Sequence, residues 1–137
     1  MQSLITKAVI GAAALAAVAA GTTAYAHHAI QAQFDTNKVV PMEGTLTKVD
    51  WINPHAWFHF EIKDSAGKAT AWRFETPGPG ALRRAGLSSK AAFPVGQTYK
   101  LEIHPSRNGE EIGFLNTITY ADGRKVNIRT LDPAAAR

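Results

Sequence analysis

The chain has 137 residues, a net charge of +4 and no cysteine. This length is typical of one small domain, and the lack of cysteine excludes disulfides, thiolate metal ligands and a cysteine nucleophile. Lysines and arginines are scattered along the chain rather than clustered, which argues against a nucleic-acid-binding surface.

The first 26 residues have the pattern of a secretory signal peptide. Lys7 precedes an almost unbroken run of small apolar residues from Val9 to Ala20, and Ala24-Tyr25-Ala26 matches an A-x-A cleavage site. The run is too short to span a bilayer comfortably, and no stop-transfer segment follows it. The pattern predicts a periplasmic or secreted protein that begins at His27, keeps 111 of the 137 residues and has no integral membrane segment.

Residues 27–38 are predicted to form a polar arm across the domain, and residues 39–131 the domain itself. In the domain, short β-rich runs alternate with turn signals. The runs predict strands over 43–51, 56–63, 69–75, 97–104, 112–120 and 125–129, and a short helix over 81–85. The tail 132–137 is expected to fray.

Alternation of side chains separates two faces in the predicted strands. In strand 56–63, the face assigned to the core carries Ala56, Phe58, Phe60 and Ile62. The opposite face, assigned to the outside or a cleft, carries His55, Trp57, His59 and Glu61. Tyr99, Leu101 and Ile103 are expected to point inward in the same way. A helix between the third and fourth of five strands is the order of an OB-type barrel. We therefore expect a mainly β, small OB-like barrel of five to six strands.

The histidines predict a metal site at the mature N-terminus. As the first residue, His27 offers its amino group and Nδ1 to Cu(II), and a further imidazole would complete a three-nitrogen site called a histidine brace. In second position, His28 offers a different chelate through the amino group, its own amide nitrogen and its imidazole. His55, after Asn53-Pro54 at the start of a strand, is the expected additional imidazole. We therefore predict copper at His27, His28 and His55.

Two further histidines fit this site less well. His59 lies four residues beyond His55 on one strand, about 13 Å away at ~3.3 Å per residue, so the two imidazoles do not share an ion. His104 is a more distant candidate, and both are expected to be surface or hydrogen-bonding residues. The competing interpretation is a histidine-rich tail that binds nothing, with His55 hydrogen-bonded to backbone.

An alternative function needs no metal. Trp51, Trp57 and Trp72 would line one face of the barrel and hold a small ligand or a partner protein, as OB-like barrels do. The chain has no G-x-S-x-G elbow, no H-E-x-x-H and no phosphate loop. We therefore do not expect an enzyme.

Several segments together resemble a family of small secreted bacterial proteins that is catalogued only as a domain of unknown function. They are HHA at 27–29, FD at 34–35, EGTLTKVDWINPHAW at 43–57, PGPGALRRAG at 77–86 and ADGRK at 121–125. The resemblance implies export and a small β-barrel-like domain, and it implies no activity. The family pattern includes His27, His28 and His55, whereas His59 and His104 are individual to this chain.

Overall fold

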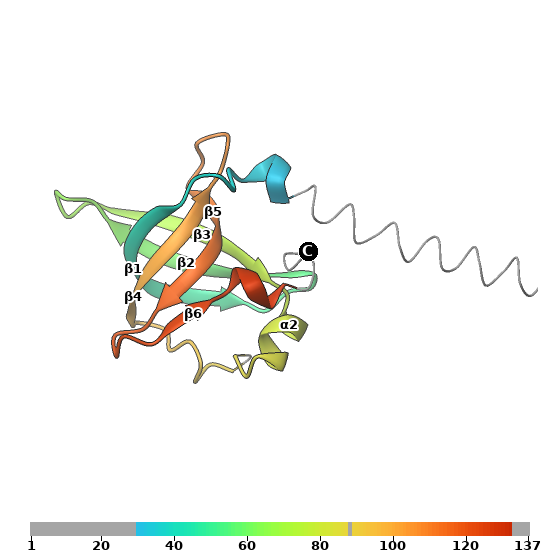
Figure 1. Ribbon diagram of the computed structural model, residues 1–137. Helices are drawn as coiled ribbons and strands as arrows, with labels where there is room; N and C mark the ends of the chain where they lie inside the picture. The colour runs from blue at the N-terminus through green and yellow to red at the C-terminus, as the bar shows by residue number, and fades with distance from the viewer. Residues whose placement is uncertain (1–29, 88, 133–137) are drawn as a thin grey trace, which may run out of the picture.

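The computed structural model describes residues 30–87 and 89–132 (Figure 1). The predicted signal peptide, His27, His28 and nearly all of the tail lie outside these residues. The elements are β1 (Val40–Asp50), β2 (His55–Lys63), β3 (Ala69–Pro77), α2 (Pro79–Arg84), β4 (Thr98–Pro105), β5 (Ile112–Thr119), β6 (Lys125–Asn127) and the 3-10 helix η1 (Arg129–Leu131). No helix in the described part of the chain is long and apolar enough to cross a membrane.

The strands form one sheet that closes into a barrel. Its order is β3-β2-β1-β4-β5-β6, and β3 also pairs with β5. That closing pair is parallel and short, from Arg73 opposite Ile112 to Glu75 opposite Phe114. Five strands therefore close the barrel and β6 is an extra strand. With α2 between β3 and β4, this architecture confirms the predicted OB-like barrel.

Gly113 lies where the barrel closes. It is opposite Phe74 in β3 and Pro105 in β4. A Cβ atom at this position would lie 2.9 Å from the carbonyl oxygen of His104 and 3.3 Å from the ring of Phe74. Only glycine therefore lets β5 approach both neighbouring strands closely.

The faces predicted from alternation are confirmed. Ala56, Phe58 and Phe60 are buried, as are Tyr99, Leu101 and Ile103, while Ile62 near the β2–β3 turn is partly exposed. Phe60 lies at the centre of this core, with its ring 5.7 Å from Phe74 and 6.1 Å from Tyr99. Aromatic side chains therefore fill much of the barrel interior.

Some strand ends differ from the prediction because pairing, not local composition, sets them. β1 begins at Val40 rather than 43, since residues 40–42 pair with β4. β3 continues to Pro77, which lies opposite His55. The last strand stops at Asn127, and the chain then forms η1.

Residues 30–38 form an arm across the outside of the barrel, drawn in blue in Figure 1. Residues 30–33 form one helical turn, which the polar, aperiodic composition did not predict. Phe34 is fully buried, packs with its ring 6.1 Å from Phe114, and forms a β-bridge with Ser106. The arm therefore has an apolar anchor on β5.

Candidate functional site

His55, the first residue of β2, forms an ion pair with a buried carboxylate on β3. Its Nδ1 contacts Oε1 of Glu75. His55 is opposite Pro77, so Glu75 is its diagonal neighbour on the same face of the sheet. The Glu75 side chain is 7% exposed, whereas that of His55 is 27% exposed. A carboxylate shielded from water thus orients an imidazole that water can reach.

The burial of Glu75 follows from the closure of the barrel. On its other side Glu75 pairs with Phe114 of β5. Residues opposite each other in adjacent strands share a face, and the arm covers Phe114 through Phe34. The contact between β3 and β5 therefore places Glu75 beside the apolar surface on which the arm packs.

The surroundings of His55 favour its charged form. The hydrogen bond to Glu75 is the main reason that the pKa of His55 lies above its ordinary value of 6.5, and the charges of Glu75 and Asp132 act in the same direction. Partial burial opposes this rise in the pKa. His55 therefore holds a proton more tightly than a free imidazole, and a metal must displace that proton to bind.

The turn before β2 is fixed by contact with the turn after β3. Asn53 and Pro54, joined by a cis peptide bond, connect β1 to His55. A Cβ atom at Gly78 would overlap the carbonyl oxygen of Pro54. Gly78, the first glycine of the PGPG segment, thus lets the backbone after β3 lie directly against Pro54. This contact positions the end of β2 that carries His55.

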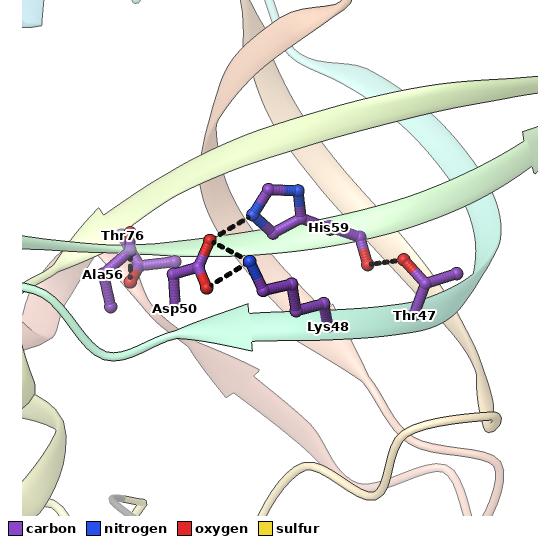
Figure 2. A network of polar contacts seen from close by, with 6 residues as sticks. All are labelled: Thr47, Lys48, Asp50, Ala56, His59 and Thr76. Carbon is purple, nitrogen blue, oxygen red and sulfur yellow. Dashed lines mark hydrogen bonds and ion pairs between the residues drawn. The ribbon is translucent and has the colours of Figure 1, made fainter.

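His59 belongs to a separate polar network on the same face of β2. Its Nε2 lies 2.8 Å from Oδ2 of Asp50, and Lys48 Nζ lies 2.7 Å from Oδ1 of the same carboxylate (Figure 2). Trp57 stands between His55 and His59 along the strand, with the Arg73 guanidinium 5.4 Å from its ring centre. His59 is a hydrogen-bonding residue, and the structure does not bring it to His55.

His104 is buried beneath the arm, with 2% of its surface exposed. Its Nδ1 lies 2.9 Å from the carbonyl oxygen of Lys38, so this nitrogen carries the proton and donates it. Among the described residues, Nε2 is buried without a hydrogen-bond partner. His104 is thus a hydrogen-bonding residue but not a surface one, because the arm covers the outer face of β4 at this point.

The three tryptophans do not share a face. Trp57 lies on the outer face, whereas Trp72 is opposite Phe60 and stacks on Phe74 with ring centres 5.8 Å apart. Trp51 packs against Phe58 and Phe93 at 6.1 and 6.4 Å. The structure therefore does not bring Trp51, Trp57 and Trp72 together into one aromatic wall, because Trp57 and Trp72 project from opposite faces of the sheet.

Sequence reasoning identified His55 but missed Glu75 and Phe34. A signal for Glu75 was present, since the turn at 64–67 sets the register of β2 and β3 and places Trp57 opposite Glu75. His27 and His28 lie outside the described residues. Within residues 30–87 and 89–132, no group of three histidine, aspartate or glutamate side chains is arranged to hold a metal ion.

The model of DUF6152, a family of unknown function, matches residues 14–116. The chain belongs to this family. The matched segment contains His27, His28, His55 and Glu75, and it extends from the predicted signal peptide into β5. No curated protein and no solved structure matches the chain significantly.

Proposed function

We propose that this member of DUF6152 is an exported metal-binding module that holds Cu(II) with its mature N-terminus and His55. The pair of His55 with Glu75 carries the proposal. Histidines that bind metals commonly present their second ring nitrogen to a carboxylate, which fixes the orientation of the ring. Because Nδ1 of His55 contacts Glu75, Nε2 is the ring nitrogen that would bind the metal.

The position of the arm supports the participation of His27. Ile30 packs in the cluster of Phe34, Ile112 and Phe114, and Phe114 lies opposite Glu75. Three residues connect His27 to Ile30, and such a segment spans at most about 10 Å. In a chain cut before His27, the amino group and the first imidazole would therefore be attached three residues from Ile30, whose cluster includes Phe114, the residue opposite Glu75.

The available donors favour copper. A site built from an amino group and imidazoles, without thiolates, suits Cu(II), which stands at the top of the affinity order for divalent metals. The amino group and both imidazoles must be deprotonated to bind. Since the pKa of His55 is raised, we expect copper affinity to fall as the pH drops through that pKa. Such a protein would serve in copper handling or as an accessory to an exported redox system.

The test is a copper titration of protein recovered from the periplasm, after intact mass has shown that the chain begins at His27. We expect about one equivalent of Cu(II). His55→Ala should weaken binding more than about tenfold, since even the loss of an outer-shell partner costs 10–100-fold, and should change the copper spectrum. His59→Ala is the matched control, because His59 is on the same face and bonded to Asp50, and it should change neither.

Two results would contradict the proposal. A chain that does not begin at His27 has no amino group at the required position, so the brace is excluded. Unchanged affinity and spectrum in His55→Ala would show that copper is held by the N-terminal tail alone.

A further inference from the structure

We propose that a groove between the end of β1 and residues 89–97, the connection that leads into β4, binds a small amphipathic carboxylate with an apolar chain. The groove has a volume of about 380 Å³, within the range of small-molecule sites. Its lining residues are Thr47, Lys48, Val49, Trp51, Lys90, Phe93 and Val95. It shares no residue with the pair of His55 and Glu75, so the proposal is independent of the copper site.

A β-bulge in β1 opens this groove. The N–H of Leu46 donates to the carbonyl oxygen of Gln97 at 2.9 Å, and the carbonyl oxygen of Leu46 accepts from the N–H of Gly96 at 2.8 Å. Between Leu46 and Lys48, the register of β1 with β2 then shifts. Because a bulge bends its strand, β1 diverges from residues 89–95 and leaves the groove between them.

The floor of the groove is joined to the barrel core. Phe93 is 1% exposed and lies edge-on to Phe58, with ring centres 4.8 Å apart. The ring of Trp51 is 6.4 Å from Phe93. Val95, by contrast, is 60% exposed and gives the groove an apolar rim. An apolar chain that covered this rim and Trp51 would remove apolar surface from water, which favours binding.

Two tyrosine hydroxyls hold the wall that carries Phe93. The hydroxyl of Tyr120 donates to the carbonyl oxygen of Ala92 at 2.9 Å. The hydroxyl of Tyr99 donates to the carbonyl oxygen of Pro94 at 3.1 Å. The backbone is therefore fixed on both sides of Phe93 before any ligand enters, and a preformed site loses less conformational freedom on binding.

The charges around the groove favour an anion. Its lining includes two lysines and, among the described residues, no acidic side chain. Lys48 is partly compensated, because its Nζ lies 2.7 Å from Oδ1 of Asp50 (Figure 2). Lys90 is exposed and forms no ion pair within the described part of the chain. The carboxylate of a ligand would therefore pair with Lys90, while its apolar chain packs against Trp51.

The test uses octanoate, titrated below its micelle concentration and followed by NMR of the indole N–H groups. Trp51 lines the groove, whereas Trp57 and Trp72 do not and serve as internal controls. We expect a saturable shift of the Trp51 signal and no comparable shift of the other two. Octanol, which has the same chain without the charge, measures the apolar part of binding separately.

Lys90→Gln tests the recognition of the carboxylate. The substitution should weaken octanoate binding about two- to fivefold, the usual effect of an exposed charge pair, and should leave octanol binding unchanged. Lys68→Gln is the matched control, because it makes the same change in net charge at an exposed position between β2 and β3. It should alter the binding of neither compound.

Val95→Asp tests the apolar rim without removing a buried ring, since Val95 is exposed and its replacement should leave the barrel folded. It should weaken both compounds, and octanoate more than octanol, because it removes apolar surface and adds a like charge.

Three results would overturn the proposal. They are the absence of a saturable shift at Trp51, equal shifts of all three indole signals, and equal affinity for octanoate in Lys90→Gln and the unsubstituted protein. Copper takes no part in these measurements, so each of these results would leave the proposed function standing.

Discussion

His55 and His59 each contact a carboxylate on the outer face of β2, but the carboxylates differ in burial. Asp50 is partly exposed and shared with Lys48, whose hydrogen bond is the main reason that the pKa of Asp50 is lowered. Glu75 is nearly inaccessible to water. Ion pairs exposed to solvent contribute little to stability. The shielded pair of His55 with Glu75 should therefore contribute more to stability than the exposed pair of His59 with Asp50.

Glu75→Gln should lower the pKa of His55, because the hydrogen bond to the carboxylate is the largest cause of its rise. A folded-state pKa above the unfolded value stabilises the protein fully below pH 6.5, and this contribution is lost as the pH rises through the folded pKa. The substitution should abolish that part of the pH dependence of unfolding. NMR titration of the His55 ring measures the pKa directly.

Asp50→Asn is the control for this titration, since Asp50 pairs with His59, whereas His55 pairs with Glu75. It should leave the His55 curve unchanged. Identical His55 titrations in Glu75→Gln and the unsubstituted protein would show that the carboxylate does not set the protonation of His55.

At the level of elements, the end of the β2–β3 hairpin depends on two turns that touch. Residues between β1 and β2 pack on the residues between β3 and α2, with Gly78 against the carbonyl group of Pro54. The contact involves backbone on both sides, so neither partner can move aside as a flexible side chain would. This contact holds His55 opposite Pro77 and diagonal to Glu75.

Gly78→Ala should therefore reduce the free energy of unfolding by about 1–3 kcal/mol, the usual cost of forcing an extra methyl group into a packed site. Denaturant unfolding measures the loss. Gly80→Ala is the matched control: its nearest neighbour is the flexible Arg84 side chain at 3.8 Å, and alanine favours the helix that contains it. Equal stability of the two variants would refute the contact between the turns.

At the scale of the whole molecule, an aromatic core fills the inside of the barrel. A short parallel pairing of β3 with β5 closes this barrel. Phe60 is fully enclosed and packs against rings from β3 and β4. No disulfide supports this arrangement, since the chain lacks cysteine. Packing of the core must therefore supply most of the stability.

Phe60→Ala should lower the free energy of unfolding by about 3–5 kcal/mol, because it removes a large buried ring and leaves a cavity. Ile62→Ala, two residues along the same face and partly exposed, should cost clearly less. Thermal or denaturant unfolding distinguishes the two. A loss below about 1 kcal/mol for Phe60→Ala would mean that the ring does not lie in a packed core.

Much of the barrel follows from the sequence because its causes are local. Alternation along 56–63 and 97–104 separates buried from exposed side chains, and the PGPG segment ends β3 before a short helix. The same local rules place His55 at a strand end. The turn at 64–67 even fixes which residue of β3 faces Trp57, so Glu75 was within reach of sequence reasoning as a neighbour of His55.

Alternation determines the face on which a side chain lies, but not what covers that face. Glu75, His104 and Phe114 lie on the outer faces of β3, β4 and β5, yet all three are buried. Contacts between distant segments bury them: β3 pairs with β5, Phe34 packs on Phe114, and the arm covers His104 at Lys38. The sequence by itself therefore determined the barrel and the position of His55. Only the tertiary structure decided that His55 has a buried carboxylate partner and that the arm packs on Phe114, opposite that carboxylate, because no local pattern specifies which distant surfaces meet.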